Sequence, residues 1–241
     1  MQATTTTAAA AHHTGDDERS AAARLADARP LERARIAGEA AVRLFRDPED
    51  TEQVFVLGLV LNRRRFPELL ARFAVEPEGA WLLYHRPAID RESVDWGRLR
   101  ALPADTLGGA YARFLDERGL DPDVFKAAPP GIPETAAYVA KRFRQTHDLW
   151  HVLTGYDTSV AGEAAVLAFT WAQTRMPSAG IVAALAGVRS GGPATGSWRR
   201  QRDAIRRGRA ARFLGAVKWE DRWERPLVEV REELGITAAA A

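Results

Sequence analysis

The sequence predicts an all-α protein, a single-domain multi-helix bundle with a metal site on a central helical hairpin. Apolar residues recur at three- and four-residue spacing in most segments, for example over residues 31–45, which is typical of amphipathic helices. The sustained two-residue alternation of half-buried strands is missing from the sequence. A chain of 241 residues is long enough to bury a core and has a usual length for one domain.

Helices are expected along most of the chain, roughly eight to ten in all. The apolar run 54–61 suits a buried strand or a buried helix, and the capping residues Asp50 and Thr51 before it favour a helix. Residues 76–79 are expected to end the helix that begins near Pro67, and residues 99–103 are expected to form a connector. The other expected helices begin near Pro67, Thr106, Pro133, Ala161, Pro177, Ser197 and Pro226. The helix that begins near Pro133 is expected to be long and to run through His151.

The first 18 residues differ from the rest and are predicted to be a disordered tail before a domain at 19–241. They are rich in Thr and Ala and lack a basic segment followed by large apolar residues, so a secretory signal is not indicated. His12 and His13 in this tail are expected to be solvated. The longest apolar run, 179–188, is far shorter than the roughly 18 residues that span a bilayer. We therefore expect a cytoplasmic protein, with peripheral contact at the inner face of the membrane as the form of any membrane role.

The charged residues are unusual in kind rather than in number. The formal net charge is +2, but Lys occurs only three times and Arg supplies the other cations. Residues 199–209 contain six arginines, which suit either a solvated helix face or attraction to anionic lipid headgroups or an isoprenoid phosphate, with Trp198 at the interface. No nucleic acid partner is expected, because no reading motif accompanies the charge. The absence of Cys excludes disulfides, thiolate metal ligands and thiol catalysis.

The segment HDLWH at 147–151, followed by Glu163, has the clearest chemical meaning. On a helix, His147 and His151 share one face, and Asp148 lies beside them. Gly155 suits the end of this helix, and a following helix would bring Glu163 back towards the histidines. Two imidazoles and up to two carboxylates form a donor set suited to zinc, iron or manganese. Taken alone, the two histidines would favour the alternative of a satisfied pair in the core; the two carboxylates favour a metal site.

Three residues just before this motif are candidates for binding a substrate: Tyr138, Arg142 and Arg144. Either arginine could hold a substrate carboxylate through two parallel hydrogen bonds. A surface position without such a role is an equal alternative for each arginine.

The motif HDxxH, followed after eleven positions by Glu, resembles the signature of the coenzyme Q (ubiquinone) biosynthesis protein 4 family. The similarity continues in the aromatic and basic run at 138–144 and in the closing segment at 219–236, and it covers about residues 30–236. The motif is fairly specific in this context, which raises the metal interpretation above the pair of core histidines.

The resemblance implies a ubiquinone-biosynthesis-type α-helical domain that binds a prenylated aromatic lipid or isoprenoid. It implies a divalent metal, zinc first and then iron or manganese, held by the catalytic positions His147, Asp148, His151 and Glu163. The implied reaction is oxidative decarboxylation, in which the C1 carboxyl of a prenylated hydroxybenzoate-type ring is lost and replaced by hydroxyl. Other quinone-biosynthesis proteins are the implied partners, and a homodimer is a further expectation.

Three alternatives to this enzyme remain. A non-catalytic scaffold could bind the isoprenoid lipid and organise a quinone-biosynthesis complex, with a structural metal. An HD-type phosphohydrolase also uses an adjacent His-Asp pair, but it calls for a further upstream His, and only His85 is available within the predicted domain. A ferritin-like di-iron centre is disfavoured because paired Glu-x-x-His motifs are missing.

Overall fold

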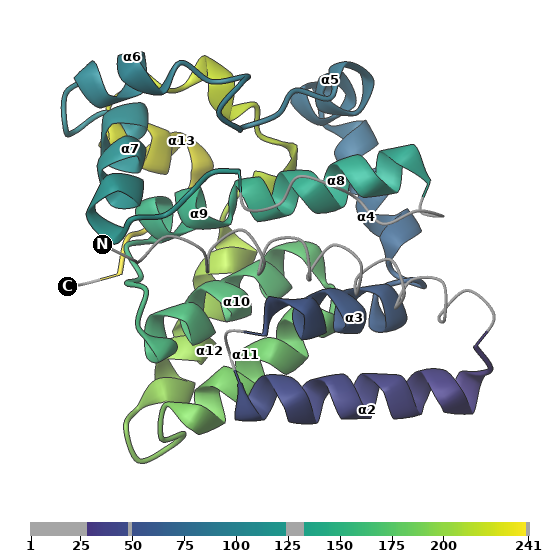
Figure 1. The fold of residues 1–241 in the computed structure, drawn as a ribbon. Helices are drawn as coiled ribbons and strands as arrows, with labels where there is room; N and C mark the ends of the chain where they lie inside the picture. Colours follow the sequence, from purple (N-terminus) through teal and green to yellow (C-terminus); the bar gives the residue numbers. More distant parts are fainter. Residues whose placement is uncertain (1–27, 48–49, 124–132, 240–241) are drawn as a thin grey trace, which may run out of the picture.

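The computed structural model describes residues 28–47, 50–123 and 133–239, and within these ranges the fold is all-helical (Figure 1). Twelve α-helices and two short 3₁₀ helices occur there, without any β-strand, which confirms the predicted all-α class. No helix in this described part is both long and apolar enough to cross a bilayer. The predicted tail, residues 1–18 with His12 and His13, lies outside the described residues.

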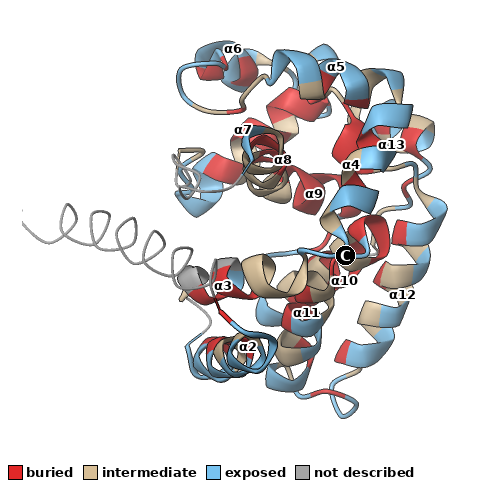
Figure 2. Ribbon diagram, turned by 90° about the vertical axis from the view of Figure 1, so that its right-hand side faces the viewer, coloured by how far each residue is buried: buried red, intermediate tan, exposed pale blue. Residues whose placement is uncertain are grey.

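Five helices form the lower group in Figures 1 and 2. They are α2 (Pro30–Arg46), α3 (Thr51–Leu61), α10 (Val160–Thr174), α11 (Pro177–Arg189) and α12 (Ser197–Ala210). The helix predicted over 54–61 is confirmed by α3, and its Leu57 packs with Leu44 of α2 and Val182 of α11 in a small apolar cluster. Burial of such side chains is the main stabilising contribution to a helical layer.

The remaining helices form the upper group. They are α4 (Phe66–Val75), α5 (Pro77–His85), α6 (Trp96–Ala101), α7 (Leu107–Arg118), α8 (Glu134–Gln145), α9 (His147–Thr154) and α13 (Leu227–Leu234), with the 3₁₀ helices η1 (Leu214–Ala216) and η2 (Trp219–Asp221). The main apolar cluster joins the two groups, because Leu149 and Leu153 of α9 and Phe169 of α10 belong to it. Helix α9 therefore lies at the centre of the core.

The structure contains more helices than the sequence patterns predict. The predicted helix end at residues 76–79 is confirmed, because α4 ends at Val75. A further helix that the sequence did not indicate, α5, begins directly there, with Pro77 in its first turn, where the missing N–H removes no hydrogen bond. The connector expected at 99–103 is largely α6, which Asp95 caps by accepting a hydrogen bond from the Arg98 N–H.

The prediction of a single long helix from Pro133 through His151 is wrong, because this segment forms two helices, α8 and α9. Thr146 ends α8 and precedes α9, with a ψ of −1° instead of the helical value of about −42°. Its hydroxyl donates a hydrogen bond to the Arg142 carbonyl, 2.9 Å away, and this kind of side-chain bond bends helices. As a result, the candidate metal ligands begin a separate short helix.

Candidate metal centre

Three side chains from α9 and α10 converge at one point. The Nε2 atom of His147 lies 3.2 Å from Oε2 of Glu163, and Nε2 of His151 lies 3.1 Å from Oε1 of the same carboxylate. The two imidazole Nε2 atoms are 3.3 Å apart. One donor atom from each of the three residues thus lies within 4.8 Å of the other two, and this group of atoms could hold a metal ion.

The connection between α9 and α10 brings these residues together. Helix α9 ends at Gly155, which adopts the left-handed conformation with a φ of 74°. Ser159 caps α10 by accepting a hydrogen bond from the Gly162 N–H, so Glu163 falls in the first turn of that helix. A side chain at Gly162 would place a Cβ 1.9 Å from the Asp157 carbonyl oxygen, so this tight connection requires glycine there.

His151 is held in one orientation. Its ring is buried, and Nδ1 lies 3.0 Å from the Tyr156 carbonyl oxygen, which can only accept a hydrogen bond. Nδ1 therefore carries the proton in the neutral ring, and the lone pair of Nε2 points at Glu163 and His147. The Phe114 ring stacks against this imidazole with centroids 5.7 Å apart. A backbone acceptor on the far nitrogen is the usual arrangement for a metal-binding histidine.

The spacing of the three donor atoms fits a metal ion. In a tetrahedral site with metal–ligand bonds of about 2.0–2.1 Å, neighbouring ligand atoms are about 3.3–3.4 Å apart. The two imidazole Nε2 atoms are 3.3 Å apart, and each lies 3.1–3.2 Å from a different oxygen of the Glu163 carboxylate. Two imidazole nitrogens and a carboxylate also form a donor set that zinc accepts in catalytic sites.

The histidines and Glu163 shift one another's pKa values. Burial alone would raise the pKa of Glu163, but the adjacent imidazoles of His147 and His151 outweigh burial and lower this pKa to about 2. Burial alone would lower the pKa of His147, but the hydrogen bond to Glu163 and the charges of Glu163 and Asp148 raise it above the ordinary value. The carboxylate is therefore ionised at neutral pH and ready to bind a cation.

Asp148 is close to the site but outside the group of three. The charges of His147, His151 and Glu163 act on it, yet its carboxyl oxygens do not join the cluster of donor atoms. Burial raises the pKa of Asp148, and the two histidines offset this only in part. Three of the four predicted metal-binding residues are thus brought together, and ligation by Asp148 stays a prediction.

The three candidate substrate-binding residues lie on α8. Arg142 is only 1% exposed and makes two hydrogen bonds to the Glu220 carboxylate, of 2.6 and 2.8 Å. Tyr138 is also buried, and burial raises its pKa to about 12. Arg144 is half-buried. Substrate binding by these residues stays a prediction, but the structure gives Arg142 a partner that the sequence did not indicate.

Sequence reasoning missed the groups that support α9 from outside. Arg231 of α13 donates from Nε to the Leu153 carbonyl at 2.9 Å and from Nη2 to the Val152 carbonyl at 2.8 Å. These carbonyls belong to the last turn of α9, which leaves its acceptors without helical partners. The Ala239 N–H completes this cap by donating to the Thr154 carbonyl at 2.7 Å. The basic residue could be read from the sequence, but its partners almost eighty positions away could not.

We expect the free energy of unfolding of the Arg231→Met variant to be about 1–3 kcal/mol lower than that of wild type, because two backbone carbonyls lose a charged hydrogen-bond donor. Urea unfolding followed by circular dichroism measures this difference. The matched control is Arg35→Met on α2, where the ion pair with Glu39 is exposed and the change should be within about 0.5 kcal/mol. Equal stability of the two variants would show that Arg231 does not support α9.

The fold and the site together define a class: an all-α protein with a His-His-carboxylate candidate metal centre at a helix–helix connection. The chain belongs to the coenzyme Q (ubiquinone) biosynthesis protein Coq4 family, whose model matches residues 24–240. This membership confirms the resemblance seen in the sequence motif and supports a role in ubiquinone biosynthesis.

Individual relatives agree with this family. The chain is 36% identical over 208 residues to a mitochondrial ubiquinone biosynthesis protein COQ4 homolog of Bos taurus, covering 83% of this chain and 76% of the relative. It is 34% identical over 216 residues to the Homo sapiens COQ4 homolog, covering 87% and 80%. A crystal structure of a putative ubiquinone biosynthesis protein from Nostoc punctiforme matches with a TM-score of 0.67 and 25% identity, over 84% of this chain and 97% of that one.

Proposed function

We propose that the chain is a metal-dependent enzyme of ubiquinone or prenylquinone biosynthesis that oxidatively decarboxylates a prenylated hydroxybenzoate-type ring. The observation that carries this proposal is the convergence of His147, His151 and Glu163 at ligand spacing. Family membership supports the pathway, and the donor set supports metal-assisted chemistry on an oxygen-bearing ring. The metal in this proposal is zinc first, with iron or manganese as alternatives.

The residues have distinct roles in this proposal. His151, fixed by the Tyr156 carbonyl, and His147 present their Nε2 atoms to the ion, and Glu163 supplies negative charge. The bound ion supplies Lewis-acid stabilisation of negative charge on a phenolate or carboxylate oxygen. Asp148, beside these residues, is a further ligand or orients a histidine.

The reaction requires an electron acceptor. When the ring carboxylate leaves as CO₂ and a hydroxyl takes its place, the ring loses two electrons in total. The proposal therefore includes a two-electron oxidant as co-substrate. If dioxygen takes this role, water supplies the hydroxyl oxygen and dioxygen is reduced to hydrogen peroxide.

The second candidate function is a non-catalytic scaffold that binds an isoprenoid lipid and organises a quinone-biosynthesis complex. One observation favours it: the three donors come from two adjacent helices, so an ion could serve only to hold α9 and α10 together. In this case the ring chemistry would belong to a partner protein.

Quinone profiling in cells separates the two functions. With Glu163→Gln as the only copy, the enzyme proposal predicts loss of quinone and accumulation of the ring that still carries its carboxyl. The matched control is Glu92→Gln, since Glu92 is exposed, and cells with this variant should make normal quinone. Normal quinone levels with a folded Glu163→Gln protein would reject the enzyme and leave the scaffold.

Partners and location are also part of the proposal. The ligand is a prenylated aromatic lipid or isoprenoid, whose tail is insoluble in water, so we propose peripheral contact with a membrane and with other quinone-biosynthesis proteins. The homodimer and the cytoplasmic location at the inner face of the membrane stay predictions.

A further inference from the structure

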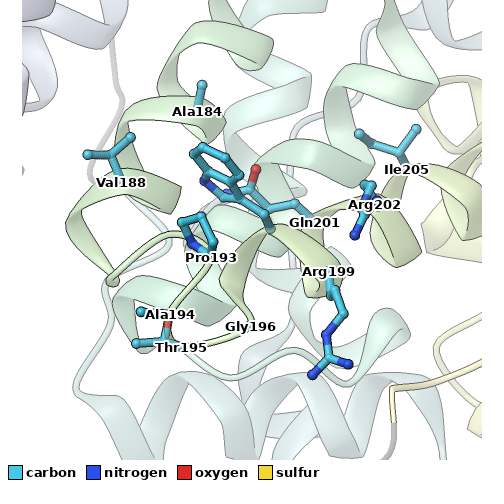
Figure 3. Close-up of a pocket in the computed structure, with 11 residues that line it drawn as sticks. Ala184, Val188, Pro193, Ala194, Thr195, Gly196, Arg199, Gln201, Arg202 and Ile205 are labelled. Carbon is cyan, nitrogen blue, oxygen red and sulfur yellow. The ribbon is translucent and has the colours of Figure 1, made fainter.

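Helices α11 and α12 enclose a pocket of about 760 Å³ near the turn that joins them (Figure 3). Val188 and Pro193 lie on one side of it in Figure 3, and Arg202 and Ile205 on the other. None of its lining residues belongs to α9 or to the first turn of α10, so this pocket is separate from the candidate metal centre. The turn lies at the lower end of the molecule in both overall views (Figures 1 and 2).

Positive charge is concentrated on α12. This helix contains six arginines and one acidic residue, Asp203, which gives it a formal net charge of +5. Because the whole chain carries +2, the other residues together carry −3. Asp203 pairs with Arg206 and Arg207, whereas Arg199 and Arg202 at the pocket are exposed and make no ion pair with any described residue. Two cations at the pocket are therefore available to an external anion.

Exposed apolar side chains accompany these arginines. Val188 is 51% exposed and the neighbouring Trp198 is 46% exposed, and both line the pocket. Ile181, Ala184 and Val188 recur at three- and four-residue spacing, so exposed apolar atoms continue along one face of α11. Tryptophan with arginines beside an apolar face is typical of surfaces that lie in the interface of a lipid bilayer.

The turn between the two helices is firmly built. The Gly192 N–H donates to the Gly187 carbonyl at 2.9 Å, and the Ser190 hydroxyl donates to the Ser197 hydroxyl at 2.6 Å. The Thr195 hydroxyl donates to the Ser190 carbonyl across the turn. Trp198 and Arg199 directly follow this turn, so their backbone is already ordered. Binding of a ligand to these two residues would therefore cost little conformational entropy.

We infer that this α11–α12 face docks on an anionic lipid bilayer. Arg199 and Arg202 contact lipid phosphates, while Trp198 and Val188 enter the boundary between headgroups and acyl chains. Charge complementarity selects this occupant, because a helix of net charge +5 in a nearly neutral chain attracts a negative surface. The exposed aliphatic side chains favour a bilayer over a nucleic acid, which would leave them in water. The surface does not depend on the proposed enzyme activity, since it shares no residue with the metal centre.

The test is sedimentation of the full chain with vesicles made of equal parts phosphatidylglycerol and phosphatidylcholine. Wild type should bind these vesicles, bind phosphatidylcholine vesicles much less, and be released by salt. The double variant Arg199→Glu/Arg202→Glu should bind at least roughly 30-fold more weakly, because each cation near an anionic surface contributes about a factor of five. Trp198→Ala should also weaken binding.

The matched control is Arg63→Glu/Arg64→Glu, which makes the same charge change at exposed positions between α3 and α4 and should bind like wild type. His147→Ala should also bind like wild type, which separates docking from the metal centre. Equal binding by the Arg199/Arg202 variant, or equal binding of wild type to phosphatidylcholine alone, would overturn the inference. If wild type binds single-stranded DNA but not vesicles, and the Arg199→Glu/Arg202→Glu variant does not bind this DNA, the occupant of the surface is a nucleic acid.

Discussion

Purified wild-type protein is expected to contain about one divalent metal ion per chain, whereas His147→Ala and Glu163→Gln should retain almost none. The His147→Ala change removes one of three donor atoms that lie within 4.8 Å of one another, and Glu163→Gln replaces a charged carboxylate donor with a neutral amide oxygen, which binds a divalent cation much more weakly. We expect affinity to fall by more than about 100-fold, since loss even of a group that only orients a ligand costs about 10- to 100-fold.

Elemental analysis of dialysed protein measures this content. The matched control is His85→Ala, because His85 is exposed, stacks on the Trp81 ring and meets the Tyr84 ring edge-on, both on α5 and outside the metal centre. This variant should retain the metal of wild type. If Glu163→Gln retains a full equivalent, or if wild type binds none when zinc, iron and manganese are each supplied, the three residues do not form a metal centre.

Metal binding should also weaken as the pH falls. A proton and a metal ion compete for the Nε2 lone pair of His147, and the raised pKa of this histidine moves the competition towards neutral pH. Glu163, with its pKa lowered to about 2, stays ionised and does not contribute to the loss. Metal titrations between about pH 5 and 8 should show affinity falling on the acidic side, and a constant affinity would contradict this assignment.

The helix connection at the site was predictable because its signals are local. Gly155 ends α9, and the serine and glycine that begin α10 lie within a few residues of it. The spacing of His147, His151 and Glu163 then decides which atoms meet, since residues four apart share a helix face. Asp148 lies about 100° round from His147 on such a helix, which explains how it is nearby without joining the donor atoms.

The break between α8 and α9 was not predictable from periodicity. The apolar stripe continues through residue 146, and nothing in the pattern says that the Thr146 hydroxyl will bond to the Arg142 carbonyl. The supports of the site were hidden for a different reason. Arg142 with Glu220, and Arg231 with the end of α9, are pairs separated by almost eighty residues, and a single sequence gives no sign of such pairing.

We expect Arg142→Met to lower the free energy of unfolding by about 3 kcal/mol or more. Arg142 of α8 is buried, and its two hydrogen bonds to Glu220 join it to η2. Removing one member of a buried ion pair leaves the other charge without compensation, which costs about 3–5 kcal/mol. The Glu220 side chain retains 22% exposure, so the lower end of this range is expected.

Urea unfolding of four proteins tests this assignment: wild type, Arg142→Met, the double variant Arg142→Met/Glu220→Leu, and Arg100→Met. The double variant should recover part of the lost stability, because no unpaired carboxylate remains. Arg100→Met is the matched control, since it also breaks an arginine–carboxylate pair. This pair has three hydrogen bonds to Asp116 but lies on the exposed surface, so the stability should hardly change. If Arg142 instead binds substrate, Arg142→Met should unfold at the same urea concentration as wild type, and cells with this variant as their only copy should lose quinone. That result would place Arg142 in the substrate site rather than in the packing of α8.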